Sequence, residues 1–295
     1  MRFAITLLAL FSANFMAMGA LEADPTDLAL VQKVYQSITE AVGDYRRNLP
    51  TIQLRNETTS IAAYRNADNK IFIENKALDI CKTFGAQTEA ALAFLISHEL
   101  SHFYQKHDWG ESGFGTSFVQ DQTTFNRHKV DEEEADTYGA FITHLAGYNT
   151  IQIIPDLLEK LYVAYDLKSR DLSAYPSLAE RKQVAEQACA KSQELISVFD
   201  VGKYLLASGE YTLAANNYAH VLQYIKCKEL YNNLGTANLY ATLRIPVQGV
   251  KDYQYPVEVD LDIPLRDGSM ALRRQLLSSA INNLQTAVNY DNRYY

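Results

Sequence analysis

The segment HELSH, residues 98–102, holds the residue types and the spacing of a metal site. Two histidines four residues apart lie on one face of a helix, so both imidazoles can reach a single ion. Glu99 borders that face and is a carboxylate that can accept a proton from an attacking water. The alternative is a helix with surface histidines. The apolar run at 91–96 counts against it, because histidines on a buried helix need partners.

A catalytic zinc needs a third protein ligand, and the acidic run at 131–134 offers candidates. Acids at a helix N-terminus are also favoured by the helix dipole, and they then point to water. Glu132 and Asp136 are four residues apart and share a helix face. Glu132 could therefore bind the ion while Asp136 accepts the ring N–H of a liganding histidine. Spacing leaves Glu133 open as well, because it is three residues from Asp136.

The metal residues require two helices to position them. We expect the first at 88–106 with Thr88 as its N-cap, then a glycine-rich loop, then a second helix at 129–146 that ends before Gly147. Before them, 25–49 reads as a helix ended by Pro50, and 61–73 as two strands around the turn at 66–69. Further helices are expected at 150–167 and 177–195.

The last hundred residues carry an internal repeat. A helix–turn–helix pattern with Gly202 near its start recurs about 33 residues later with Gly235, and this period resembles tetratricopeptide (TPR) repeats. The alternative is a generic helical pair. Residues 243–269 interrupt the repeat, and within them 257–263 alternates between apolar and acidic residues, as in a strand with one wet face.

The N-terminus has the charge, apolar run and small-residue exit of a secretory signal peptide at 1–20, with cleavage expected near 19–23. The alternative is an uncleaved membrane anchor. Export permits disulfides, and the three cysteines, Cys81, Cys189 and Cys227, allow at most one intramolecular pair.

Composition indicates a globular chain long enough for two modest domains. Of the 295 residues, 47% are hydrophobic and 21% are charged, and the formal net charge is −8. The chain has no basic patch with interleaved aromatics, so we expect no nucleic-acid partner. No segment after residue 20 is apolar enough to cross a bilayer, so we expect membrane contact to be peripheral at most.

HELSH at 98–102 followed by EEEAD at 132–136 resembles the HExxH and ExxAD pair of the HtpX-like and CAAX prenyl protease family of gluzincin metallopeptidases. The resemblance covers roughly residues 50–190. It implies that His98 and His102 bind Zn²⁺, that Glu132 is the third ligand, that Glu99 is the general base, and that Asp136 orients a liganding histidine.

The same resemblance points to Tyr175 and Arg181 as groups that stabilise the transition state. Many relatives have a His-Pro pair before an arginine at this spacing, and here Tyr175 stands at the histidine position. A tyrosine hydroxyl can still donate to a developing oxyanion. The alternative is a helix N-terminal turn with a structural arginine.

We therefore expect an α+β, mostly α fold. A zincin-type catalytic domain with a small sheet would span 21–194, and TPR-like helices with a β insertion would span 195–295. The chain resembles exported members of this family that couple the catalytic domain to TPRs. That resemblance implies an exported zinc endopeptidase, periplasmic or secreted, that cuts unfolded envelope proteins. Substrate would pair with an edge strand at 71–74, and the repeats would dock substrate or an envelope protein. The alternative function is a TPR-led chaperone or assembly module whose zinc site is structural or capped.

Overall fold

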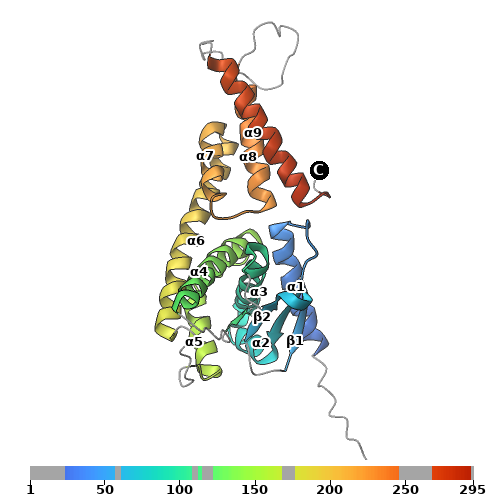
Figure 1. Ribbon diagram of the computed structural model, residues 1–295, viewed down its shortest axis with the longest axis vertical. Helices are drawn as coiled ribbons and strands as arrows, with labels where there is room; N and C mark the ends of the chain where they lie inside the picture. The colour runs from blue at the N-terminus through green and yellow to red at the C-terminus, as the bar shows by residue number, and fades with distance from the viewer. Residues whose placement is uncertain are drawn as a thin grey trace, which may run out of the picture.

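The computed structural model describes residues 24–56, 61–107, 112–114, 122–167, 177–245 and 268–293 (Figure 1). These residues form many helices and one small sheet, which confirms the expected α+β, mostly α class. The expected signal peptide and the alternating segment at 257–263 lie outside the described residues. Within the described ranges, no helix combines the length and the hydrophobicity needed to span a membrane.

The N-terminal part contains the sheet and the helices around it. Its elements are α1 (Pro25–Val42), β1 (Thr51–Arg55), β2 (Ala62–Arg65), β3 (Lys70–Glu74), α2 (Asn75–Lys82), α3 (Thr88–Gln105) and β4 (Ser112–Phe114). The first helix ends earlier than the sequence predicted. Gly43 adopts the left-handed conformation, φ 61°, and its N–H donates to the Thr39 carbonyl, so a glycine C-cap stops the helix before Pro50.

The sheet has the strand order β1-β3-β2-β4, and its central strands form the predicted hairpin. β2 and β3 are antiparallel, and a short 3₁₀ turn at Asn66–Asp68 joins them. β1 pairs with β3 in parallel, and β4 pairs with β2. The prediction that 71–74 forms an edge strand is wrong, because β1 and β2 flank β3 on both sides. The sequence analysis missed β1, whose only apolar side chains are Ile52 and Leu54.

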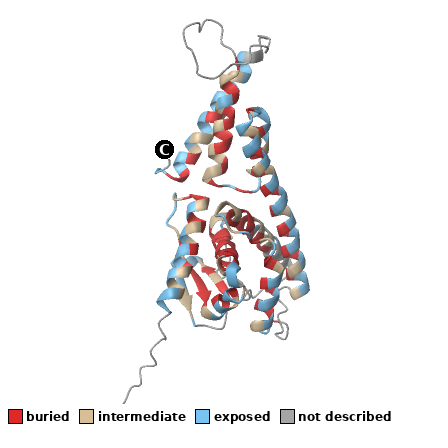
Figure 2. Cartoon of the chain, turned by 180° about the vertical axis from the view of Figure 1, so that it is seen from behind, coloured by how far each residue is buried: buried red, intermediate tan, exposed pale blue. Residues whose placement is uncertain are grey.

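Helix α3 lies at the centre of the N-terminal part, against α1, α2, the sheet and α4 (Figure 1). Every residue from Ala90 to Phe103 is buried (Figure 2). The helix starts at Thr88 after a 3₁₀ turn, so Gln87 takes the N-cap position expected for Thr88. Because α3 is buried on all sides, the polar residues of HELSH are removed from bulk water.

Three helices follow in sequence: α4 (Gln122–Leu145), α5 (Ile154–Ala164) and α6 (Leu178–Ala207). Helix α4 starts earlier than expected but ends as predicted, before Gly147 with φ 87°. Ser177 and Glu180 form a capping box at the start of α6. This helix is 30 residues long and continues from the N-terminal part into the C-terminal hairpins (Figure 1), so the boundary expected at 194/195 falls inside one helix.

The C-terminal part contains α7 (Tyr211–Val221), α8 (Lys228–Leu243) and α9 (Gly268–Tyr290), which pack in sequence order onto the end of α6. A Cβ on Gly202 would lie 2.9 Å from Tyr218 Cε1, and a Cβ on Gly235 would lie 2.7 Å from Leu284 Cγ. The two glycines that the repeat aligns therefore make the same kind of close contact in the pairs α6–α7 and α8–α9.

The two parts meet where the chain after α1 contacts the end of α9. The Tyr45 N–H donates to the Tyr290 carbonyl at 2.7 Å, and the Arg46 guanidinium lies 3.7 Å from the centre of the Tyr290 ring. All three cysteines are buried and free, so no disulfide joins them.

Candidate metal centre

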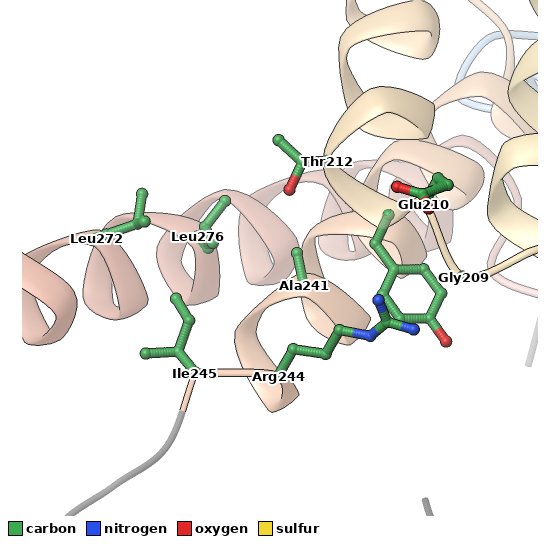
Figure 3. Close-up of a pocket in the computed structure, with 9 residues that line it drawn as sticks. Gly209, Glu210, Thr212, Ala241, Arg244, Ile245, Leu272 and Leu276 are labelled. Atoms are coloured by element: carbon green, nitrogen blue, oxygen red, sulfur yellow. The ribbon is translucent and has the colours of Figure 1, made fainter. Parts of the chain in front are cut away.

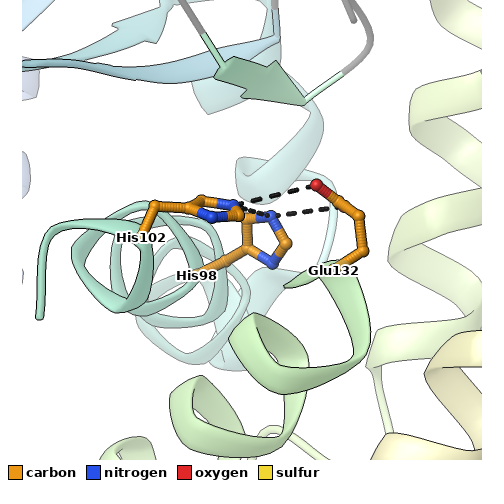
Figure 4. Close-up of side chains that lie close together, drawn as sticks. All are labelled: His98, His102 and Glu132. Atoms are coloured by element: carbon orange, nitrogen blue, oxygen red, sulfur yellow. Dashed lines mark hydrogen bonds and ion pairs between the residues drawn. The ribbon is translucent and has the colours of Figure 1, made fainter. Parts of the chain in front are cut away.

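His98 and His102 on α3 meet Glu132 on α4, with their ligand atoms turned toward one another (Figure 4). The two histidine Nε2 atoms are 3.2 Å apart. Glu132 Oε2 lies 3.5 Å from His98 Nε2, and Glu132 Oε1 lies 3.7 Å from His102 Nε2. Ligand atoms of a tetrahedral zinc with bonds near 2.0–2.1 Å are about 3.3 Å apart. The three side chains thus have the spacing of one face of a zinc tetrahedron.

The charge balance of this cluster also fits a cation. Glu132 is only 6% exposed, and its Oε2 is buried without a hydrogen-bond partner among the described residues. The Arg181 guanidinium, with Nη2 3.5 Å away, supplies part of the positive charge that a buried carboxylate needs, and a metal ion at the cluster would supply more. Glu133, which the spacing had left open, is half-buried and outside the cluster. The structure therefore brings Glu132, and not Glu133, to the histidines.

Asp136 holds the ring of His98 from the other side. His98 Nδ1 lies 2.8 Å from Asp136 Oδ1, so Nδ1–H donates to the carboxylate and the Nε2 lone pair points to the cluster. Burial alone would raise the pKa of Asp136. The Arg181 guanidinium and His98 outweigh that effect and lower this pKa to about 2. The carboxylate is therefore ionised, and it fixes the His98 tautomer that a zinc ligand needs.

Arg181 is completely buried behind Asp136. Its guanidinium donates to both carboxylate oxygens, with Nη2 2.8 Å from Oδ1, and Nη2 also lies 3.5 Å from Glu132 Oε2. These contacts are those of a positioning residue, and they match the structural arginine that was the alternative to an oxyanion contact. Tyr175, the other residue predicted to stabilise the transition state, lies outside the described residues.

Glu99 is fully buried, and the sheet orients its carboxylate. The backbone N–H of Tyr64 on β2 donates to Glu99 Oε2 at 2.7 Å. The hairpin predicted at 61–73 therefore has a direct part in the site, because it holds the carboxylate expected to act as base beside the two histidines.

His107 is a residue of the site that the sequence analysis missed. It follows the left-handed C-cap Lys106, φ 60°, which turns its ring back onto α3. His107 Nδ1 lies 2.9 Å from His102 Nδ1, and His107 Nε2 lies 3.4 Å from Glu134 Oε2. The signal that could have found it is a third histidine five residues after the second, near the acidic run.

The tautomers give His107 a role toward His102. If His102 binds an ion through Nε2, its Nδ1 carries the proton and donates to His107 Nδ1. His107 then carries its own proton on Nε2, toward Glu134 and toward Asp131, whose Oδ1 is 3.8 Å away. The group His107, Asp131 and Glu134 also has metal-ligand spacing. That protonated Nε2 has no lone pair for a second ion while His102 binds the first.

Gly139 lets α4 approach α3 closely enough for these contacts. A Cβ at this position would lie 2.9 Å from Ser97 Oγ and 3.2 Å from the backbone nitrogen of His98. Any side chain here must push the helices apart. Because Glu132 and Asp136 lie one to two turns before Gly139 on α4, their distance to His98 depends on this close contact.

We expect Gly139→Ala to weaken zinc binding by about tenfold, since a shift of a few tenths of an ångström disturbs both the ligand and its orienting carboxylate. Competition with a chromogenic chelator measures the affinity. Gly235→Ala is the matched control, because its Cβ meets Leu284 at a similar distance far from the metal centre. The control should lower the melting temperature without changing zinc affinity. Unchanged zinc affinity in Gly139→Ala would contradict this dependence.

A separate cavity of about 290 Å³ lies in the C-terminal part, between α7, α8 and α9 (Figure 3). Leu272 and Leu276 line one side of it, and Glu210 and Arg244 line the other. The Arg244 guanidinium lies 4.6 Å from the centre of the Tyr211 ring. This cavity contains none of the predicted site residues.

No protein-family model matches this chain, and a search of curated proteins finds no match either. The gluzincin resemblance therefore stays a prediction that rests on the two sequence motifs.

Proposed function

We propose that this protein is a zinc-dependent endopeptidase of the gluzincin type that acts on unfolded polypeptides. One observation carries the proposal. His98, His102 and Glu132 have the spacing of a zinc-binding face, and the carboxylate of Glu99 is held on the same helix beside them. This is the arrangement that hydrolysis of an amide requires: a Lewis-acid site with a base next to it.

Each residue of the proposed site has a defined part in this chemistry. When bound, zinc supplies a Lewis acid that polarises the scissile carbonyl and lowers the pKa of water. Glu99 takes a proton from the attacking water and delivers it to the leaving amine. The Tyr64 amide keeps Glu99 in position for both transfers. Asp136 and His107 hold the ligand histidines in the tautomer that leaves Nε2 free to bind.

The arrangement of the sheet favours an unfolded polypeptide as the substrate. An extended peptide can add to a sheet only at an edge, and folded proteins rarely present such a segment. Among the described strands, β4 lies at the edge of the sheet beside β2, the strand whose Tyr64 amide holds Glu99. We place the substrate along β4, in place of the position at 71–74 that the sheet order excludes.

The helices α6 to α9 would act as TPR-like docking repeats. The equivalent glycine contacts of Gly202 and Gly235 support two related hairpins, and the cavity in Figure 3 offers them a mixed apolar and charged surface. The signal-peptide pattern at 1–20 supports export of the enzyme, which would be periplasmic or secreted. We infer that it acts there on misassembled envelope proteins.

One observation favours a different function. His98 and Glu99 are 0% exposed and His102 is 2% exposed, so these side chains have almost no contact with solvent. A closed site of this kind suits a structural zinc. In that case the helical hairpins would act alone as a chaperone or assembly module.

Metal removal separates the two functions. We expect the zinc-loaded chain to cleave casein, to lose that activity with 1,10-phenanthroline, and to regain it when zinc is added back. The measurement is fragment release on a gel, with zinc content determined by mass spectrometry. If the chelator lowers the melting temperature and no preparation cleaves, the zinc is structural and the peptidase function is wrong.

A further inference from the structure

A second cavity lies where the N-terminal part meets the C-terminal hairpins. Its volume is about 450 Å³, and it is lined by the chain after α1, the end of α3, α4, the segment before α8 and the end of α9. None of the residues predicted for the metal centre lines it. Its lining is rich in arginine, lysine and tyrosine.

The charges of this cavity leave an excess of positive charge. Arg46 is matched by Asp44, whose two carboxylate oxygens accept from it at 2.8 and 2.7 Å. Arg47 has no such acid among its described partners. Its Nη2 donates to the Phe103 carbonyl at 2.9 Å, at the end of α3. Lys106 and Lys226 are exposed, and within the described residues neither ammonium group makes an ion pair.

Three cations without a matching carboxylate are therefore gathered in one cavity of a chain whose net charge is −8. Cations of one sign repel one another, and a concave site concentrates their field. An anionic group placed between them would be held by charge-assisted hydrogen bonds, which are about twice as strong as neutral ones.

Tyrosines form the walls of the same cavity. The Tyr104 hydroxyl is buried and has no hydrogen-bond partner among the described residues, so it holds a donor that a ligand can use. Tyr138 is 3% exposed and Tyr290 is 4% exposed, and both contribute to the lining. The site thus combines hydrogen-bond donors with positive charge above a wall of buried tyrosine rings.

We propose that this cavity binds the free C-terminal carboxylate of a polypeptide. A planar carboxylate needs only a few donors, and Lys106, Lys226 and the Tyr104 hydroxyl supply them. Tyr104 and Lys106 follow the ligand His102 within one turn, so a bound chain end lies next to the metal helix. The choice of a polypeptide as the source of the carboxylate rests on the proposed function.

Binding of a labelled peptide tests this site. The zinc-loaded full chain with Glu99→Gln serves as the background, so that cleavage does not consume the peptide. A fluorescein-labelled decapeptide that ends in a free phenylalanine carboxylate is compared with the same peptide as its C-terminal amide. We expect the amide to bind at least about tenfold more weakly, as measured by fluorescence anisotropy, because it loses a charge-assisted contact.

Two variants locate the binding. Lys106→Gln combined with Lys226→Gln should weaken binding of the free-carboxylate peptide by about tenfold and leave binding of the amide unchanged. Tyr104→Phe should weaken binding of the free-carboxylate peptide by a smaller factor. Lys203→Gln, an exposed lysine on α6 outside the cavity, is the matched control and should have no effect.

Equal affinity for the acid and the amide would overturn the proposal. Two other results would also overturn it, because they would show a phosphate site. One is displacement of the peptide by inorganic phosphate at micromolar concentration. The other is binding to phosphatidylglycerol vesicles that the double variant no longer shows. Casein cleavage is measured separately with Glu99 intact. Cleavage without carboxylate binding refutes this site alone, whereas carboxylate binding without cleavage refutes the proposed peptidase.

Discussion

Replacing Glu99 with glutamine should lower casein cleavage by the zinc-loaded chain at least about 100-fold while zinc affinity stays within about threefold of the wild type. Glutamine has nearly the same shape and can still accept the Tyr64 N–H through its carbonyl oxygen. It has no basic oxygen to take a proton from water. Cleavage rates on casein and chelator competition for zinc measure the two quantities separately.

The matched control for this experiment is Glu133→Gln. Glu133 is a half-buried acid of the same acidic run, and it lies outside the ligand cluster. It should retain both activity and zinc. If Glu99→Gln cleaves as fast as the wild type, Glu99 is not the base. If Glu133→Gln loses zinc, the ligand assignment drawn from the geometry is wrong.

Replacing Arg181 with methionine should destabilise the zinc-free protein by about 3–5 kcal/mol. Arg181 is completely buried, and its guanidinium contacts Asp136 and Glu132. Its loss therefore leaves two buried carboxylates without this positive charge beside them. Urea unfolding followed by circular dichroism measures the change. Zinc should narrow the difference from the wild type, because an ion beside Glu132 replaces part of the lost positive charge.

The pH dependence of the Arg181 variant follows from Asp136. The pKa of this carboxyl is lowered to about 2 in the folded protein, whereas an unfolded aspartate titrates near 3.9. A carboxyl group whose pKa is lower in the folded state stabilises the fold at pH values above its pKa in the unfolded chain. This contribution to stability is lost as the pH falls toward the folded-state pKa. The difference in unfolding free energy between the wild type and Arg181→Met should therefore shrink as the pH falls from about 4 to about 2.

Lys182→Met is the matched control for the Arg181 variant. Lys182 is the next residue on α6 and pairs with Glu159 at the surface, 2.5 Å away. Exposed pairs of this kind contribute at most about 1 kcal/mol. An Arg181→Met effect no larger than that of Lys182→Met would show that the buried carboxylates do not depend on the arginine.

Local patterns in the sequence were sufficient for several features. The spacing of His98 and His102 predicted adjacent imidazoles, because residues four apart on a helix always share a face. The hairpin at 61–73 and the glycine end at Gly147 were also predicted correctly, since both depend on neighbouring residues. The assignment of zinc, of a base and of TPR-like repeats stays a prediction that the experiments above test.

Contacts between distant segments decided the remaining features. The sequence could not choose between Glu132 and Glu133, because the choice depends on how α4 is rotated against α3 at Gly139. It placed a sheet edge at 71–74 because the short strand β1 carries too weak an apolar pattern to be recognised. The boundary expected at 194/195 lies within α6, because a continuous helix carries no signal for where its packing partners change.

Arg181 and His107 show the same limit within the site. The family resemblance pointed to Arg181 as a group that stabilises the transition state, with a structural arginine as the alternative, and its buried guanidinium pairs with Asp136 on another helix. The ring of His107 reaches His102 only through the left-handed turn at Lys106. The sequence by itself determined which side chains one helix brings together. The packing of α3, α4, α6 and the sheet decided which carboxylates and cations complete the site, because those partners come from residues far apart in the chain.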